Sequence, residues 1–130
     1  MDFTIEPGIT KTLEKIVNHS DLATAHGSGT VEVFSTPAMI AFMEQTAMES
    51  VEHLLPKGYV SVGTEINVKH LQATPIGMKV TCHAKLAHVE KRKLIFEVSA
   101  SDSKGEIGIG THTRFIVEKK RFLEKLEQSV

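Results

Sequence analysis

The amino-acid sequence places one carboxylate, Glu44, within the apolar arc of a predicted helix. At about 100° per residue, this arc gathers five apolar residues, Ile40, Met43, Ala47, Val51 and Leu54. Glu49 and Glu52 fall on the opposite, polar side. A carboxylate in an apolar surrounding is costly unless it is paired, protonated or used in chemistry. Glu44 is therefore a candidate nucleophile or general base, and the alternative is a carboxylate that reaches solvent at the rim of a sheet.

His70 lies in a later strand pattern, in which alternate residues share a face. One face carries Glu65, Asn67 and Lys69, and the other carries Ile66, Val68 and His70. His70 should therefore point toward the apolar helix. Taken alone, such a histidine is commonly a hydrogen-bonded core residue. In the same layer as a helix carboxylate, it can instead take part in general acid-base or nucleophilic chemistry.

Thr36 precedes Pro37 at the predicted start of the helix, a position typical of an N-cap. A helix N-terminus also offers free amides and a partial positive charge, which suit the oxyanion of an ester or thioester under attack. Eight residues of straight helix span about 12 Å, so Thr36 cannot contact Glu44 directly. The two can act together only through a substrate, a bent helix start or a neighbouring subunit.

The other reactive residue types indicate no metal or cofactor. The seven histidines show no metal-ligand spacing, the closest pair being His83 and His88, so neither zinc nor another cofactor is expected. Cys82 alternates with core residues and is interpreted as packing rather than as a nucleophile. Gly108 and Gly110 precede a strand pattern, so they are expected to permit close backbone approach rather than to bind phosphate.

Two periodicities define the elements that position these residues. Apolar residues recur at helical spacing from Thr36 to Leu55, and Pro56 and Gly58 end that pattern. Residues 9–17 predict a strand, and residues 18–30 predict a loop. Beyond Tyr59 the alternation of apolar residues predicts four strands, over residues 60–71, 78–89, 94–100 and 107–117. Residues 119–128 form a charged tail that can be helical.

One apolar helix beside a sheet with one apolar face predicts an α+β fold, in which an antiparallel sheet wraps around a long central helix. The last three strands form a meander joined by turns at residues 90–93 and 103–105. An exposed sheet edge invites pairing with a second copy of the chain. A homodimer is therefore expected, and two dimers could associate further.

The length and amino-acid composition of the chain limit the classes of protein to which it can belong. The 130 residues fit one domain, residues 1–130, and 15 basic against 16 acidic side chains provide no field that attracts nucleic acid or an anionic membrane. The single cysteine cannot form an internal disulfide, and the N-terminus lacks signal-peptide features, so a cytoplasmic protein is expected. No apolar run approaches the roughly 18 residues that a membrane-spanning helix requires.

Three segments together resemble the hotdog-fold thioesterases related to fluoroacetyl-CoA thioesterase. They are VFSTPAMIAFMEQTA (residues 33–47), VGTEINVKHLQATPIG (residues 62–77) and IGIGTHTRFIV (residues 107–117). The resemblance covers most of the chain. It implies a single hotdog thioesterase domain that acts on an acyl-CoA.

The resemblance also implies a catalytic triad. In that family a threonine heads the central helix, a glutamate follows eight residues later and a histidine 26 residues after that; Thr36, Glu44 and His70 reproduce both spacings. The family's glycine before the histidine, here Gly63, is associated with holding the thioester carbonyl. The fluoroacetyl-specific member carries aromatic lid residues where this chain has Gly27 and Thr30, which implies a different small acyl group.

His112 and Arg114 share one strand face and are candidate substrate-binding residues. Together with the basic residues 91–93 they could meet the phosphates of CoA. The alternative is an ordinary solvated charged face.

These residues predict thioester hydrolysis, with Glu44 as nucleophile or general base, His70 orienting and shuttling protons, and Thr36 supporting the thioester oxygen. One alternative is a hotdog dehydratase or hydratase, which pairs a histidine before the helix with a helix carboxylate. His26, in the preceding loop, lies in no such motif. The other alternative is a non-catalytic acyl-CoA-binding module, which has little reason to bury a carboxylate beside its ligand.

Overall fold

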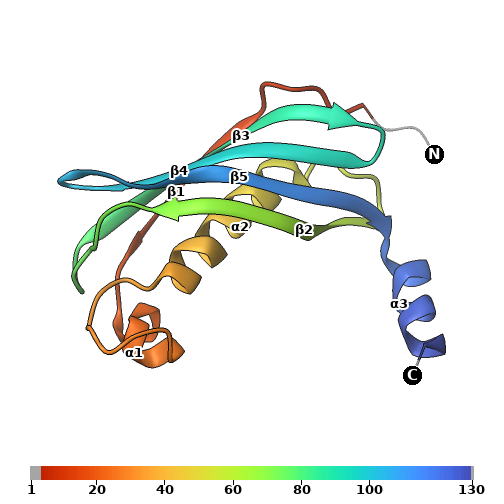
Figure 1. Cartoon of the computed structure of the whole chain (residues 1–130). Coiled ribbons are helices and arrows are strands. Elements are labelled where there is room, and N and C mark those ends of the chain that lie inside the picture. Colours follow the sequence, from red (N-terminus) through yellow and green to blue (C-terminus); the bar gives the residue numbers. More distant parts are fainter. Residues whose placement is uncertain (1–3, 130) are drawn as a thin grey trace.

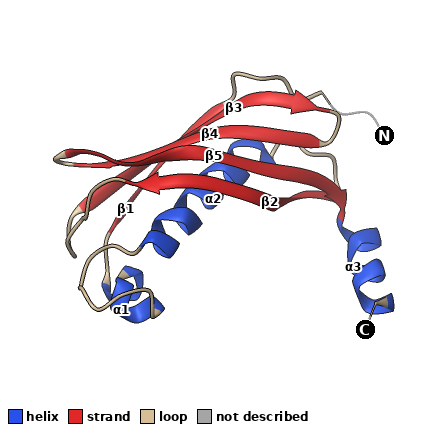
Figure 2. Ribbon diagram, viewed as in Figure 1, coloured by secondary structure: helices blue, strands red, loops and turns tan. Residues whose placement is uncertain are grey.

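The computed structural model describes residues 4–129 as a curved sheet around one long helix. The elements follow the order β1 (Thr10–Ile16), 3₁₀ helix η1 (His19–Asp21), α1 (Ala23–His26), α2 (Thr36–Glu52), β2 (Tyr59–His70), β3 (Lys79–Glu90), β4 (Lys93–Asp102), β5 (Gly105–Glu118) and α3 (Lys119–Gln128). Figures 1 and 2 show α2 along the concave side of the sheet and α3 projecting from the end of β5. The α+β architecture expected from the sequence is confirmed.

The sheet is antiparallel throughout, with the strand order β1-β3-β4-β5-β2. Its inner face packs on α2 through alternate residues of β3 and the central strand β4, each at most 2% exposed: Val80, Cys82, Ala84, Leu86, Leu94, Phe96, Val98 and Ala100. This period-2 burial is the pattern that the sequence predicted. β1 and β2 form the two edges of the sheet. Within residues 4–129, β2, which carries His70, therefore pairs with another strand along one edge alone.

Helix α2 is capped by Ser35, so the predicted cap at Thr36 is wrong by one residue. The Ser35 side chain accepts a hydrogen bond of 3.1 Å from the backbone N–H of Ala38, and Pro37 occupies the first turn. Ser35 is 2% exposed, whereas Thr36 is exposed and already helical. Because Ser35 satisfies the helix end, the Thr36 hydroxyl is free for another partner.

Replacing Ser35 with alanine should lower the free energy of unfolding by about 1 kcal/mol, the typical cost of a lost N-cap. Thr36→Ala removes no cap and should cost less than about 0.5 kcal/mol. Urea denaturation of both variants beside the parent protein measures the difference. Equal losses in the two variants would contradict this assignment of the cap.

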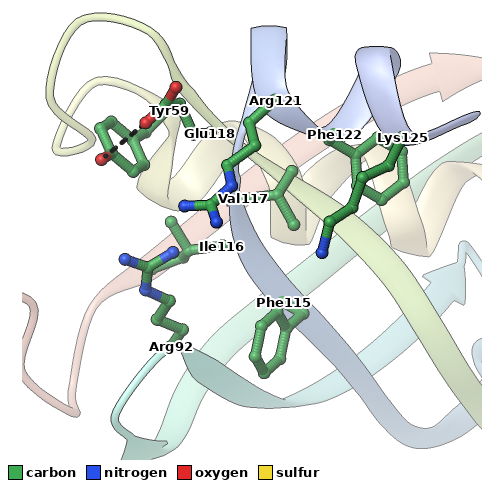
Figure 3. Close-up of a pocket in the computed structure, with 9 residues that line it drawn as sticks. All are labelled: Tyr59, Arg92, Phe115, Ile116, Val117, Glu118, Arg121, Phe122 and Lys125. Carbon is green, nitrogen blue, oxygen red and sulfur yellow. Dashed lines mark hydrogen bonds between the residues drawn. The ribbon is translucent and has the colours of Figure 1, made fainter.

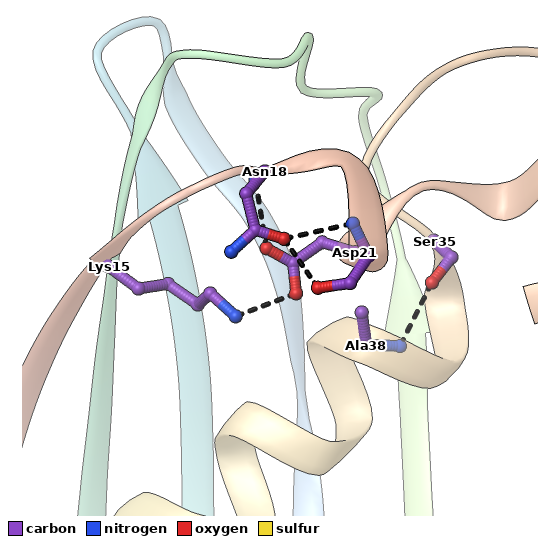
Figure 4. A network of polar contacts seen from close by, with 6 residues as sticks. Lys15, Asn18, Asp21, Ser35 and Ala38 are labelled. Carbon is purple, nitrogen blue, oxygen red and sulfur yellow. Dashed lines mark hydrogen bonds and ion pairs between the residues drawn. The ribbon is translucent and has the colours of Figure 1, made fainter. Parts of the chain in front are cut away.

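The loop predicted before α2 instead contains the two short helices η1 and α1, and it is anchored by a polar network (Figure 4). Asp21, 6% exposed, accepts hydrogen bonds from the Lys15 ammonium at 2.7 Å and the Asn18 backbone N–H at 3.0 Å. The Asp21 carbonyl in turn accepts from the Ser35 backbone N–H at 2.9 Å. A paired, hydrogen-bonded carboxylate therefore fixes the start of α2 relative to β1.

Gly110 permits the close approach of β5 to β2. A Cβ added there would clash with the backbone oxygen of Asn67 and lie 2.6 Å from Val68 Cα, neither of which can rotate away. At Gly108 an added Cβ would lie 2.5 Å from Met39 Sδ, a flexible side chain on α2. The expected close backbone approach is therefore confirmed at Gly110, whereas Gly108 makes room for a side chain of α2.

Between residues 4 and 129 the structure contains no helix of the length and apolarity that crossing a membrane would require.

Candidate active site

Thr36 and His70 meet where the start of α2 faces the end of β2. The Thr36 Oγ1 and His70 Nδ1 atoms lie 2.8 Å apart, within hydrogen-bonding distance. Thr36 is the first residue of α2 and His70 the last of β2, so rigid elements hold both groups. They line a cavity of about 330 Å³ together with neighbouring residues that include Ala23, Val33 and Phe34.

The His70 ring is half-buried and lacks a partner on its second nitrogen. Burial lowers the pKa of His70 below the ordinary 6.5, and the backbone of Gln72 opposes this shift in part. Nε2 is buried and forms no hydrogen bond with any residue that the structure describes. A neutral imidazole with one nitrogen held by Thr36 and the other unpaired can accept or donate a proton at Nε2.

Glu44 lies apart from that pair, on the border of the buried face of α2. Glu44 is half-buried, as are Ile40 and Met48, which lie one turn before and one turn after it on α2. Met43 and Ala47 beside it are fully buried. The hydrogen bonds and ion pairs formed by residues 4–129 do not join Glu44 to Thr36 or His70. The sequence placed Glu44 inside the apolar arc, and the structure places it at the rim of that arc.

The buried pair His112 and Arg114 lies within electrostatic range of Glu44. Burial lowers the pKa of both groups, and the negative charge of Glu44 acts in the opposite direction on each. For His112 a hydrogen bond with the Glu65 backbone also raises the pKa, whereas the Arg114 charge lowers it. The chain therefore holds two separate polar clusters, one formed by Thr36 and His70 and the other by Glu44 with His112 and Arg114.

Hydrogen bonds fix the orientation of the His112 and Arg114 side chains. His112 Nδ1 donates to the Glu65 carbonyl at 2.8 Å, which leaves Nε2 to accept from Arg114 Nη1 at 3.1 Å. Arg114 also donates to the Ser61 hydroxyl at 2.8 Å and to the Ser61 carbonyl at 2.9 Å. These bonds select a neutral His112 beside a charged guanidinium, since arginine keeps its proton in proteins.

Gly63 lies next to the side chains of His112 and Arg114. The register of the β2–β5 pairing shifts at this point, between Gly63 and Glu65. A Cβ on Gly63 would lie 3.1 Å from His112 Cε1 and 3.4 Å from Arg114 Nη1. The missing side chain therefore leaves room for two large polar groups beneath the strand.

The solvated charged face suggested for His112 and Arg114 is wrong, because they are only 1% and 7% exposed. Both point toward α2 from the inner face of β5, away from the exposed residues 91–93. Sequence reasoning also missed Ser61, the main partner of Arg114. The only sequence signal was its place two residues before Gly63 on the same strand face.

Cys82 is fully buried, and burial raises its thiol pKa, as expected for a packing residue rather than a nucleophile. Among the residues that the structure describes, no cluster of three or more His, Cys, Asp or Glu side chains could hold a metal ion.

Comparison with known proteins places this architecture in a group of enzymes. A family model described as fluoroacetyl-CoA-specific thioesterase matches residues 17–120. The fluoroacetyl-CoA thioesterase of Streptantibioticus cattleyicolor is 37% identical over 127 residues, covering 98% of this chain and 87% of the relative.

Solved structures agree with the sequence comparisons. A structure of the fluoroacetyl-CoA thioesterase FlK superposes with a TM-score of 0.91 at 33% identity, covering 98% of each chain. A hot-dog-like protein from Thermanaerovibrio acidaminovorans superposes with a TM-score of 0.88 at 28% identity, covering 95% of this chain and 91% of its own.

A central helix wrapped by a five-stranded antiparallel sheet, with these relatives, defines a hotdog-fold thioester hydrolase that acts on acyl-CoA. The hydratase and non-catalytic alternatives are thereby set aside. The chain belongs to the fluoroacetyl-CoA-specific thioesterase family.

Proposed function

We propose that this enzyme hydrolyses a small acyl-CoA to the free acid and CoA, using Thr36, Glu44 and His70 as its catalytic residues. The observation that carries the proposal is the 2.8 Å contact between Thr36 Oγ1 and His70 Nδ1, with His70 Nε2 buried and unpaired. A buried polar atom without a hydrogen-bond partner is costly unless a substrate or a water molecule supplies the missing hydrogen bond.

In the proposed reaction, Glu44 either takes the proton from an attacking water or attacks the thioester carbonyl itself. The second route forms a mixed anhydride, which water then hydrolyses to the free acid and the Glu44 carboxylate. Thr36 and the amides at the start of α2 stabilise the negative charge that develops on the carbonyl oxygen. As the carbon–sulfur bond breaks, His70 donates a proton to the departing CoA thiolate, and it regains a proton from the water that is consumed in the hydrolysis. Gly63, His112 and Arg114 form the wall against which the acyl group lies.

The separation of Glu44 from Thr36 and His70 supports a homodimer with shared active sites. β2 is a 12-residue edge strand, long enough to pair with a second β2 about a two-fold axis. The half-buried side of α2 that carries Ile40, Glu44 and Met48 would then gain a neighbour. We place the Glu44 carboxylate of one protomer opposite the Thr36 and His70 of the other.

The acyl group that we propose is small but not fluoroacetyl. The segment between α1 and α2 carries Gly27 and Thr30 and contains no aromatic residue between positions 27 and 32. Fluoroacetyl-CoA is the substrate named for the relative from Streptantibioticus cattleyicolor. We further propose that residues 1–130 act as one domain in a reducing cytoplasm, in line with the single buried cysteine.

The pH dependence of His70 provides one test of its role. Burial lowers the folded-state pKa of His70 below 6.5, so the active neutral ring should persist below pH 6.5 and be lost only at lower pH. The unfolded chain takes up the proton first, so this histidine also contributes stability that is lost as the pH falls from 6.5 through the folded pKa. NMR titration of the His70 ring nitrogens measures the midpoint directly. A midpoint above 6.5 would contradict the burial argument.

The activity itself is tested by thiol release from purified protein with acetyl-, propionyl-, isobutyryl-, benzoyl- and fluoroacetyl-CoA. We expect turnover of the short non-fluorinated esters. Hydrolysis of fluoroacetyl-CoA alone would overturn the proposed substrate class. Absence of turnover on every ester would overturn the proposed function.

A further inference from the structure

A second pocket lies at the start of β2, whereas His70 is the last residue of that strand. Figure 3 shows the residues that line this pocket. The pocket has a volume of about 330 Å³ and is lined by the start of β2, the turn between β3 and β4, the end of β5 and helix α3. Three cations line it, Arg92, Arg121 and Lys125, together with the aromatic residues Tyr59, Phe115 and Phe122. The proposed catalytic residues Thr36, Glu44 and His70 do not line this pocket.

The positive charge of this pocket is not neutralised by the protein. The ion pairs formed by residues 4–129 are Lys15–Asp21 and Lys79–Glu14, and neither involves the three cations of the pocket. One carboxylate, Glu118, also lines it and lies 3.4 Å from the Tyr59 hydroxyl as a hydrogen-bond acceptor. Three cations against one carboxylate leave an excess of two positive charges in a space large enough for a ligand.

The aromatic side chains offer flat apolar surface beside those charges. Phe115 is 41% exposed and Phe122 is 37% exposed, although phenylalanine is among the residue types most often fully buried. The Arg92 guanidinium lies 5.8 Å from the Tyr59 ring centroid, which orients it at the pocket wall. Aromatic faces that can stack on a purine, surrounded by cations that bind phosphate, form a combination suited to a nucleotide.

We propose that this pocket binds the phosphorylated adenosine end of the CoA substrate. The proposal rests on the proposed acyl-CoA hydrolysis and adds a binding site distinct from the catalytic residues. Arg121 and Lys125 lie one turn apart on α3 and contact the phosphates, while the adenine stacks on Phe115 or Phe122.

The proposed dimer brings this pocket to an active site. Within one protomer the 12 residues of β2 separate Tyr59 from His70 by about 36 Å, which one CoA molecule cannot span between its nucleotide and its thioester. When two β2 strands pair antiparallel over their full length, the start of each lies opposite the end of the other. The pocket of one protomer therefore serves the Thr36 and His70 of its partner.

The test compares two substrates that carry the same acyl group, an acyl-CoA and the acyl-pantetheine thioester, which lacks the nucleotide. The variant is Arg121→Glu/Lys125→Glu, and the matched control is Lys120→Glu on the same helix, an exposed residue that does not line the pocket. In the double variant the ratio of kcat/KM for the CoA ester to that for the pantetheine ester should fall at least about tenfold, as expected for lost charge-assisted hydrogen bonds. Lys120→Glu should leave that ratio within about twofold of the parent value. Circular dichroism melts verify that both variants are folded.

Equal kcat/KM values for the two esters in the parent enzyme would overturn the nucleotide pocket while leaving the proposed hydrolysis intact. An unchanged ratio in the double variant would do the same. Failure of the parent enzyme on both esters would instead overturn the proposed function. In that event, binding of adenosine 3′,5′-bisphosphate, measured by calorimetry and lost in the double variant, would still support the pocket.

Discussion

Replacement of Glu44 by glutamine is expected to lower kcat/KM by about 10²–10⁴-fold, the range that one general acid-base group contributes. Glutamine matches the carboxylate in shape but can neither attack a carbonyl nor take a proton from water. The fold should persist, because the hydrogen bonds and ion pairs formed by residues 4–129 do not include Glu44. Thiol release with the best acyl-CoA measures the loss, and thermal melts measure the stability.

Glu49→Gln is the matched control, since it makes the same change five residues later on α2. Glu49 accepts a hydrogen bond from Gln45 and lies outside the candidate site. Its variant should retain activity within about twofold of the parent. Full turnover by Glu44→Gln would remove Glu44 from the mechanism.

Mixing two inactive variants should restore activity if the sites are shared between protomers. One variant carries Glu44→Gln and the other His70→Asn, and each alone should be close to background. In a mixed dimer, the intact His70 of the first protomer faces the intact Glu44 of the second, so one of the two sites is complete. Random exchange makes half of the dimers mixed, so about one quarter of the parent activity should return.

The outcome of that mixing experiment depends directly on where Glu44 acts. If Glu44 and His70 of the same protomer formed a site, every site in every dimer would lack one residue, and the mixture would stay at background. Refolding the two variants together from urea, with each refolded alone as control, provides the measurement. Size-exclusion chromatography verifies that both samples contain dimers.

Alternation and helical spacing were sufficient to predict the main elements. The strands expected at residues 60–71 and 78–89 are β2 (Tyr59–His70) and β3 (Lys79–Glu90), within one residue at each end. These strands are long, and one face of the sheet is buried against α2, so the period of two is unambiguous. The two short helices before α2 were missed, because polar turns of three or four residues carry no periodicity.

The local details of the site needed tertiary structure. Ser35 and Thr36 are both good capping residues, and sequence cannot decide which hydroxyl turns toward the Ala38 amide and which toward His70. The burial of Arg114 depends on Ser61 and on the space above Gly63, which arise from the β2–β5 pairing. Strand alternation indicated that His112 and Arg114 share a face, but not that this face is the inner one.

The adjacent hydroxyls of Ser35 and Thr36 give this enzyme freedom to evolve. Ser35 holds the helix together, and Thr36 is the residue that contacts His70. Selection on the reaction can therefore exchange the side chain at position 36 for serine or cysteine without eroding the folding of α2. Substitutions at position 36 can therefore change the chemistry of the site while Ser35 keeps the helix cap. The protein thus avoids the loss of stability that usually accompanies changes in an active site.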